Sequence, residues 1–230
     1  MDEDRPGFWG QLSPRDQDRL AAAGRIGQFP AGSTVCRQGD PATHLFVLIS
    51  GWVKVVTVNR DGQEAVLALR GDGDVVGELA GELAGFRTAT MYAVGDVTAV
   101  VIAHERFSAY LDGCPPAAHA YRRMLAQRFS DSADSLRAQA TTSGAQRLAR
   151  LLITLGRRHG AAPGPEAGGP ALVITLPLSQ EELASLASAS RATVTRALHD
   201  WRERGLIQTG HRRIAITNLD ALQRLAGLDP

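Results

Sequence analysis

The stretch Gly77-Glu78-Leu79-Ala80-Gly81-Glu82-Leu83-Ala84-Gly85-Phe86-Arg87-Thr88-Ala89-Thr90 decides how the rest of this chain is interpreted. Turn and strand residues precede it at 71–76, so the sequence predicts that a strand ends at Gly77 and that a short helix begins there. The first N–H groups of a helix are unpaired and carry partial positive charge, which suits an anion. An anion-binding position is therefore predicted at Gly77.

Two side chains later in the stretch return to the same place. Arg87 and Thr88 supply a guanidinium fork and a hydroxyl, which suit a phosphate. Glu78 would repel a phosphate, but its carboxylate can accept hydrogen bonds from the hydroxyls of a sugar. A phosphate and a sugar together indicate a nucleotide. The alternative is a surface turn in which Glu78 and Arg87 form a structural ion pair.

Gly-Glu-Leu-Ala followed by Arg-Thr-Ala-Thr resembles the phosphate-binding cassette of cyclic-nucleotide-binding domains in the CRP/FNR family of bacterial transcription regulators. The resemblance implies that Glu78 accepts from the ribose 2′-hydroxyl, that Arg87 pairs with the cyclic phosphate and that Thr88 donates to it. The backbone N–H groups implied as helpers belong to Gly77, Leu79 and Ala89. Cyclic AMP is the effector expected from the family. Cyclic GMP is the second choice, because a Thr after the Arg also occurs in cyclic-GMP sites.

Composition narrows the class of protein. The 230 residues are 44% hydrophobic and 21% charged, with a net charge of +1, which is ordinary for a globular chain. There is neither an opening signal pattern nor an apolar run of about 18 residues, so we expect a cytoplasmic protein without membrane contact. The only cysteines, Cys36 and Cys114, are too few for a disulfide framework or a four-cysteine iron–sulfur cluster.

The remaining chemistry-bearing residues do not form an active-site pattern. His44 and His104 are isolated and carry no motif for haem ligation, so we expect no haem and no metal. The sequence contains no nucleophile–base set, no metal-ligand cluster and no Walker-type loop. An enzyme, or a regulatory subunit of one, is therefore disfavoured.

Short apolar runs separated by turn residues fill the segment 26–103. They lie at Leu45–Ile49, Val53–Val58, Ala65–Leu69 and Val97–Ile102. The turn residues between them include Gly51, which is predicted to end the first strand, and residues 59–62. Regular spacing of this kind predicts a small closed β-roll or barrel. The phrases Gln38-Gly39-Asp40, Leu45-Phe46-Val47-Leu48 and Ser50-Gly51-Trp52-Val53-Lys54-Val55 also resemble the β-roll of the CRP/FNR family.

A long helix is predicted from Pro115 to Thr141 or Thr142. A heptad seam on it, with spacings of four and three, consists of Ala118, Arg122, Leu125, Phe129, Ser132 and Leu136. Such a seam predicts pairing with a partner helix, so we expect a parallel homodimer through residues 115–142. The resemblance implies that Ser132 contacts the base of the nucleotide. The alternative for Ser132 is a small residue tolerated in the seam.

The C-terminal third contains the signature of a winged helix-turn-helix. Ser179 and Glu182 form a capping box, Ser190 caps a second helix after a tight turn, and residues 206–216 predict a two-strand hairpin. Residues 190–213 hold six arginines against two acidic residues, and binding to double-stranded DNA gains much of its affinity from neutralising phosphates. The alternative is a basic helix that packs against another protein.

The second helix of this unit is the candidate for base recognition. Ser190-Arg191-Ala192-Thr193-Val194-Thr195-Arg196 resembles the start of the recognition helix in the CRP/FNR family, where Glu is common at the position of Ala192. Arg191 and Arg196 can donate to guanine in the major groove. Since the family's Glu accepts from cytosine, its absence predicts an altered preference at one base pair of each half-site. The predicted DNA-contacting residues are Ser190, Arg191, Thr193, Thr195, Arg196, Arg212 and Arg213.

Together these patterns predict an α+β protein with three parts. They are a cyclic-nucleotide-binding β-roll domain at 1–112, a dimerisation helix at 113–143 and a winged helix-turn-helix DNA-binding domain at 144–230. The predicted function is a homodimeric transcription regulator that binds an inverted-repeat operator under the control of cyclic AMP, with RNA polymerase as an expected partner. The alternatives are control by cyclic GMP or another small molecule, or constitutive binding.

Overall fold

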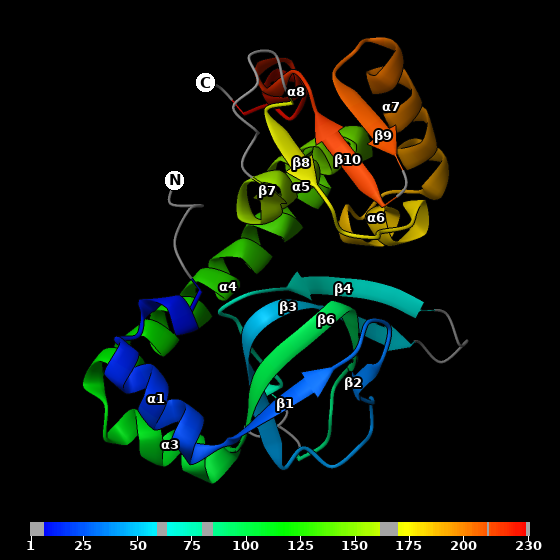
Figure 1. Ribbon diagram of the computed structural model, residues 1–230. Coiled ribbons are helices and arrows are strands. Elements are labelled where there is room, and N and C mark those ends of the chain that lie inside the picture. The colour runs from blue at the N-terminus through cyan, green and yellow to red at the C-terminus, as the bar shows by residue number, and fades with distance from the viewer. Residues whose placement is uncertain (1–6, 59–63, 80–84, 162–169, 211, 229–230) are drawn as a thin grey trace. The chain divides into compact units, whose positions relative to one another are not determined.

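The computed structural model describes residues 7–58, 64–79, 85–161, 170–210 and 212–228. Within it the chain divides into two compact units, one ending at Asp131 and the other beginning at Ser132, which are described separately below. Strands dominate the first unit, and helices with a small sheet make up the second (Figure 1). The predicted α+β class is confirmed, while the predicted domain boundaries stay a prediction.

The first unit is built on an antiparallel sheet with the order β1-β6-β3-β4, in which β2 also pairs with β6 and β5 with β3. Its strands are β1 (Arg25–Phe29), β2 (Thr34–Cys36), β3 (His44–Val58), β4 (Glu64–Arg70), β5 (Val75–Val76) and β6 (Thr90–Ala103). The predicted turn at 59–62 lies outside the described residues. The sheet confirms the predicted β-rich domain.

The prediction that Gly51 ends a strand was wrong. The two apolar runs on either side of it belong to one 15-residue strand, β3. Gly51 has φ +88°, and the register of β3 against β6 shifts around it, so it forms a bulge and not a turn. A Cβ at this position would lie 2.2 Å from the carbonyl oxygen of Asp96, which leaves room only for glycine.

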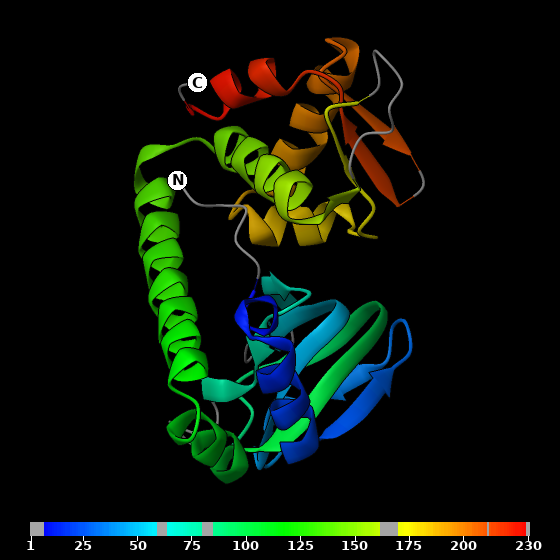
Figure 2. The same cartoon turned by 60° about the vertical axis from the view of Figure 1, so that its left-hand side comes forward.

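Helices pack against one end of this sheet. They are η1 (Trp9–Gln11), α1 (Pro14–Ala23), α3 (His104–Asp112) and the first part of α4 (Pro115–Thr141), which Figure 2 shows as one continuous helix. The Ser13 side chain caps α1, as its position before Pro14 predicts. Phe8 is fully buried and packs edge-on against Phe107 and Tyr121, which ties the N-terminal segment to α3 and α4.

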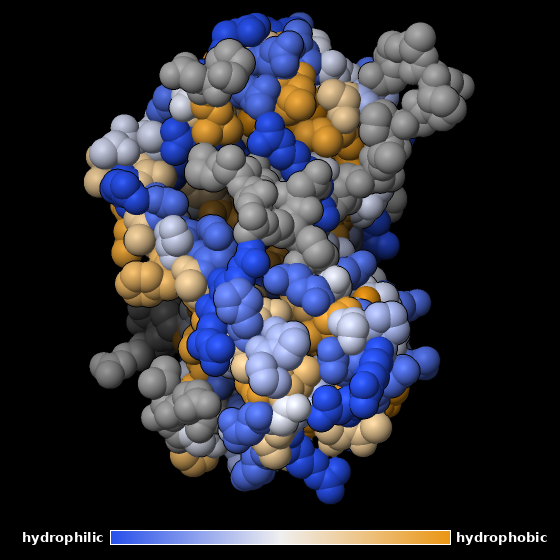
Figure 3. All heavy atoms as spheres, turned by 90° about the vertical axis from the view of Figure 1, so that its left-hand side faces the viewer, coloured by the Kyte–Doolittle hydropathy of each residue, from blue (hydrophilic) through white to orange (hydrophobic). Residues whose placement is uncertain are grey.

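α4 has two different faces within the predicted helix. One face packs into the core through Ala117, Ala120 and Met124. The predicted seam lies beside it, and two of its members, Phe129 and Leu136, are 79% and 68% exposed in the single chain. Apolar residues also reach the surface among polar ones elsewhere on the molecule, as the face in Figure 3 shows, so exposure alone does not define an interface.

The second unit joins helices to a four-stranded antiparallel sheet with the order β7-β8-β10-β9. The elements are α5 (Gly144–His159), β7 (Gly160–Ala161), β8 (Leu172–Ile174), α6 (Gln180–Leu186), α7 (Arg191–Glu203), β9 (Ile207–Gly210), β10 (Arg213–Ile216) and α8 (Leu219–Leu225). The glycines, alanines and prolines of residues 156–170 predict an irregular connection, but α5 continues past Gly156 to His159. Residues 162–169 lie outside the described ones.

Among the described residues, no helix is both long enough and apolar enough to cross a membrane.

Candidate nucleotide site and candidate DNA-binding surface

The backbone at Gly77 has the predicted form. β5 ends at Val76, and Glu78 and Leu79 are helical, while residues 80–84 of the stretch lie outside the described ones. Gly77 has φ +83°, a conformation that glycine adopts without strain. A Cβ at Gly77 would lie 2.4 Å from Nη1 of Arg87. Position 77 therefore requires glycine both for its backbone and for the side chain beside it.

Backbone pairing with an earlier turn brings Arg87 back to Gly77. The N–H of Arg87 donates to the carbonyl of Asp40 at 2.8 Å, and the N–H of Gly39 donates to the carbonyl of Arg87 at 2.9 Å. The N–H of Ala42 donates to the carbonyl of Gly85 at 2.8 Å. The returning segment thus has a fixed register against residues 39–42, which sets the position of the arginine.

The guanidinium of Arg87 is almost fully buried, with the residue 3% exposed. Its Nη2 donates to the carbonyl oxygen of His44 at 2.7 Å and its Nη1 to that of Gly77 at 3.4 Å, and Cζ lies 5.2 Å from the centre of the Phe46 ring. Burial lowers the pKa of Arg87 below its ordinary value. A cation held away from water beside Gly77 is well placed to bind an anion.

Glu78 is also buried, at 7% exposure, and it forms an ion pair with a residue that the sequence did not suggest. Nη1 of Arg128, on α4, lies 2.7 Å from Oε1 of Glu78, and Nη2 of Arg128 lies 3.0 Å from Oδ1 of Asp74. The sequence also allowed an ion pair between Glu78 and Arg87, but in the structure the carboxylate of Glu78 pairs with Arg128. One arginine of α4 therefore links both acidic residues around Gly77 to the long helix.

A sequence signal for Arg128 exists but is weak. Met124 and Arg128 are four residues apart on the helix, so Arg128 continues the inward-facing side and lies off the predicted seam. An arginine at the end of an apolar face predicts a buried acidic partner. It does not identify which one, because the partners lie about 50 residues away in the chain.

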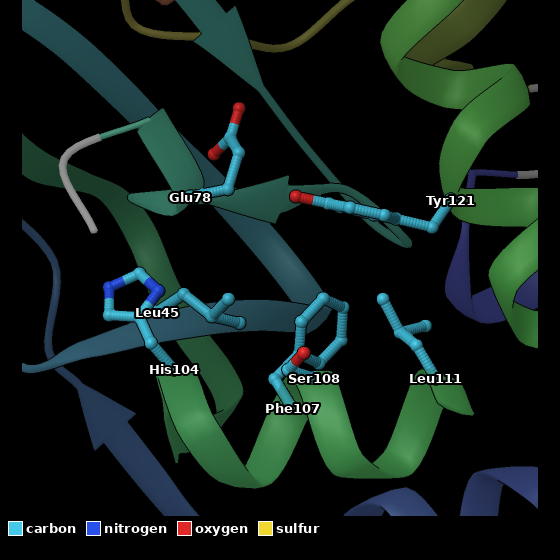
Figure 4. A pocket seen from close by; sticks show the side chains of 7 residues that line it. All are labelled: Leu45, Glu78, His104, Phe107, Ser108, Leu111 and Tyr121. Atoms are coloured by element: carbon cyan, nitrogen blue, oxygen red, sulfur yellow. The ribbon is translucent and has the colours of Figure 1, made fainter. Parts of the chain in front are cut away.

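A small cavity of about 50 Å³ lies behind Glu78. Figure 4 shows the Tyr121 ring extending from α4 toward Glu78, with Leu45, Phe107 and Leu111 on the opposite side. Ligand pockets for molecules of drug size measure about 300 Å³ or more. This cavity is therefore too small to hold a whole nucleotide.

The other predicted ligand-binding residues have different environments. Thr88 is exposed, Ala89 is buried and the Leu79 side chain is 53% exposed. Ser132 is exposed and lies one helical turn beyond Arg128 on α4. Ser132 belongs to the second compact unit, so its predicted contact with the base stays a prediction.

The helix-turn-helix is capped as predicted. Ser179 and Glu182 form the complete capping box of α6, and the Ser190 side chain accepts from the N–H of Thr193 at 3.1 Å at the start of α7. The hydroxyls of Ser190 and Thr193 are 2.9 Å apart. These two predicted DNA-contacting residues therefore also hold the first turn of the recognition helix.

One side of α7 is apolar and buried, and the other is polar and exposed. Val194, Leu198 and Trp201 pack inward, whereas Arg191 and Arg196 are exposed. The hydroxyl of Thr195 lies 2.7 Å from Oε1 of Gln180, the first residue of α6, and sequence reasoning did not include this partner. The exposed side presents donors at the N-terminal half of the helix, as major-groove recognition requires.

The hairpin β9–β10 forms the predicted wing, with Arg213 paired to Gly210. Arg212 and Arg213 are both exposed at its tip, and Arg212 has φ +55°. His211, between them and Gly210, lies outside the described residues. Two cations on an exposed turn can contact the phosphate oxygens of a bound duplex.

Two family descriptions match this chain. The cyclic nucleotide-binding domain matches residues 26–113, and the Crp-like helix-turn-helix domain matches residues 146–225. The "CRP-like cAMP-activated global transcriptional regulator" of Mycobacterium tuberculosis is 34% identical over 198 residues, which cover 86% of each chain. The "Cyclic AMP receptor protein" of Thermus thermophilus is 29% identical, with 96% of each chain covered.

A solved structure leads to the same assignment. The crystal structure of a CRP-family transcriptional regulator from Thermus thermophilus aligns with a TM-score of 0.70 and 27% identity, covering 87% of this chain and 96% of that one. A β-roll with a phosphate-binding cassette and a winged helix-turn-helix define a DNA-binding transcription regulator with a cyclic nucleotide-binding domain. This chain belongs to the CRP/FNR family, whose members are transcription regulators and not enzymes.

Proposed function

We propose that the protein is a homodimeric transcription regulator whose binding to an inverted-repeat operator is controlled by cyclic AMP. The observation that carries the proposal is the position of buried Arg87 beside Gly77, the residue that directly precedes buried Glu78. The guanidinium supplies charge for a cyclic phosphate, and the carboxylate supplies an acceptor for a ribose hydroxyl. Two relatives described by their cyclic AMP response support this choice over cyclic GMP.

The ligand would act through α4. Arg128 pairs with Glu78 from α4, so a sugar hydroxyl that donates to Glu78 changes the surroundings of a helix residue directly. The exposed apolar residues Phe129 and Leu136 support a second copy of α4 as the partner on the seam. Ligand raises DNA affinity only if it binds the DNA-competent arrangement of the two helices more tightly than the other.

The proposed operator has two half-sites about one helical turn of DNA apart, roughly 34 Å. Arg191 and Arg196 read guanines, while Arg212 and Arg213 contact phosphates. Ala192 is exposed on α7 where the family commonly carries Glu. The proposal therefore includes a relaxed preference at one base pair of each half-site. It also includes contact with RNA polymerase and a cytoplasmic location, where the DNA of a bacterium lies.

Calorimetric titration with cyclic AMP and then cyclic GMP tests the sensor. The wild-type protein is expected to bind cyclic AMP at micromolar concentration or tighter, and Arg87→Ala is expected to weaken binding by about 100-fold through loss of charged hydrogen bonds. Arg106→Ala, which removes an exposed arginine from α3, is the matched control and should bind normally. Preference for cyclic GMP would change the effector, and no binding of either would contradict the proposal.

A further inference from the structure

A single arginine holds the junction of α4 and α5 to the turn of the helix-turn-helix. Arg147 lies in the first turn of α5. Its Nε donates to the carbonyl of Ala187 at 2.9 Å and its Nη2 to that of Ser188 at 2.6 Å. Its Nη1 donates to the carbonyl of Thr142. Three nitrogens of one planar group thus bind backbone oxygens from two separate segments.

Those two segments have defined positions in the second unit. Thr142 immediately follows the last residue of α4, and Ser143 caps α5 through its contact with the N–H of Gln146. Ala187 and Ser188 follow α6 and form the turn that leads to α7. Arg147 therefore connects the end of the long helix to the turn immediately before the recognition helix.

The turn itself has an unusual backbone. Ser188 has φ +47°, which a residue other than glycine rarely adopts and which costs about 1 kcal/mol. Its carbonyl accepts from Arg147, and its hydroxyl accepts from Nε2 of Gln139 on α4 at 3.2 Å. A strained conformation persists where neighbouring groups fix it. The two contacts from the α4–α5 region are such groups.

Close packing accompanies the hydrogen bonds. A Cβ on Gly144, the first residue of α5, would lie 2.9 Å from Cβ of Ala189 and 3.3 Å from Cγ2 of Thr193. Thr193 belongs to the first turn of α7, beside the exposed Arg191. The backbone of Gly144 therefore packs too closely against Ala189 and Thr193 to leave room for a side chain at this position.

We propose that Arg147 is a positioning residue for DNA recognition, which transmits the arrangement of the α4–α5 junction to the N-terminal half of α7. The inference rests on the proposed function, since it assigns α7 to the major groove and α4 to ligand response. Arg147 makes its contacts through carbonyl oxygens and is not itself placed among the DNA-contacting residues.

Arg150 provides a matched control three residues later on the same helix. Its Nε donates to the carbonyl of Ala226 at 2.7 Å and its Nη2 to that of Gly227 at 3.4 Å, so it holds the end of α8 in a similar way. Both arginines bind backbone carbonyls from α5. Arg147 alone of the two binds the turn before α7.

The test compares the wild-type protein, Arg147→Lys and Arg150→Lys. The probes are a fluorescent duplex that the wild-type protein has enriched from a random-sequence library, and an unrelated duplex of equal length. The first measurement is the ratio of the two affinities at one salt concentration. Since lysine keeps the charge but cannot bridge three carbonyls, Arg147→Lys is expected to lower this ratio about tenfold, with binding to the unrelated duplex unchanged.

The second measurement is the factor by which cyclic AMP raises affinity for the enriched duplex. Arg147→Lys should reduce this factor about tenfold, while its affinity for cyclic AMP in the absence of DNA stays within about twofold of wild type. Arg150→Lys should leave both measurements unchanged. If Arg147→Lys keeps the wild-type specificity ratio, or if Arg150→Lys lowers it equally, the inference is wrong.

A replacement variant and a readout that does not depend on cyclic AMP cover the two ways in which this test could fail. If circular dichroism shows that Arg147→Lys does not fold, Gln139→Ala replaces it, because this exposed residue binds only the Ser188 hydroxyl among the contacts above. It is expected to lower the specificity ratio about twofold to threefold, and an unchanged ratio overturns the inference. If cyclic AMP has no effect on the wild-type protein, the proposed effector fails, and the specificity ratio alone still tests Arg147.

Discussion

An alanine methyl group at position 77 would collide with the guanidinium that the nucleotide site depends on. Gly77→Ala places Cβ 2.4 Å from Nη1 of Arg87 and forces a φ near +83° on a residue with a side chain. We expect a loss of about 1 kcal/mol of unfolding free energy from the backbone. We also expect a fall of about tenfold or more in cyclic AMP affinity, measured by calorimetry, because Arg87 must move.

The control Gly32→Ala separates the effect of backbone strain from the effect of the collision with Arg87. Gly32 has a similar φ of +79°, but no atom of the described residues lies within 4 Å of a Cβ there. This control should lose a similar amount of stability in urea denaturation and keep its cyclic AMP affinity. Equal losses of ligand affinity in the two variants would show that backbone strain, and not the contact with Arg87, explains the effect.

The ion pair between Arg128 and Glu78 is expected to stabilise the folded protein. The side chain of Arg128 is 17% exposed and that of Glu78 is 8% exposed, so Arg128→Gln leaves a buried carboxylate without its cation. Because Arg128 is partly exposed, we expect a loss of about 2 to 3 kcal/mol in unfolding free energy, below the range of about 3 to 5 kcal/mol for a fully buried pair, measured with urea. Adding Glu78→Gln should restore at least half of that loss, because the buried charge is then removed.

Arg123→Gln is the control for this pair, since Arg123 is exposed on the same helix. A change within about 0.5 kcal/mol is expected for it. If Arg128→Gln also stays within that range, the pair between α4 and the cassette contributes no stability, and Arg128 holds its position for another reason.

At the scale of elements, local signals in the sequence predicted the helices well and the long strands less well. Ser13, Ser179 and Ser190 act as helix caps where their positions predict, because a cap needs only neighbouring backbone N–H groups. Gly51 was misinterpreted, since a glycine with positive φ can make either a turn or a bulge. Pairing with β6, 40 or more residues away, decides between them.

At the candidate site too, residues within one local motif were predicted and long-range partners were not. Gly77, Glu78 and Arg87 were predicted together because their motif lies within one short segment, and the structure brings them together. Arg128 and Arg147 were not predicted as partners. Each acts through contacts with residues about 40 to 50 positions away in the chain, and a local pattern does not identify such partners.

The seam of α4 is expected to hold the dimer together. Phe129 is 79% exposed in the single chain, so Phe129→Glu should leave the stability of a monomer unchanged. In a dimer it removes two buried rings and opposes two carboxylates, so we expect the dimer dissociation constant to rise at least about 100-fold. Sedimentation equilibrium measures this change. Ser130→Glu, one residue away and off the seam, should leave the constant near that of wild type.

At the scale of the whole molecule, each compact unit contains an arginine that connects α4 to another segment of the same unit. Arg128 ties the cassette to α4, and Arg147 ties the end of α4 to the turn before α7. α4 continues from the first compact unit into the second. In the proposed function a ligand signal passes along this route from Glu78 to the recognition helix.

Such a route must work in both directions. If cyclic AMP raises affinity for the enriched duplex by some factor, then saturating duplex must raise affinity for cyclic AMP by the same factor, because both changes measure one coupling free energy. We expect a factor between about 5 and 150, measured by titrating cyclic AMP into the protein with and without the duplex. The unrelated duplex should produce a smaller factor, since it does not require the precise spacing of the two recognition helices. The contradicting outcome is that cyclic AMP strengthens DNA binding but the enriched duplex leaves cyclic AMP affinity unchanged. The two titrations would then sample different oligomeric states, because the dimer assembles on the DNA.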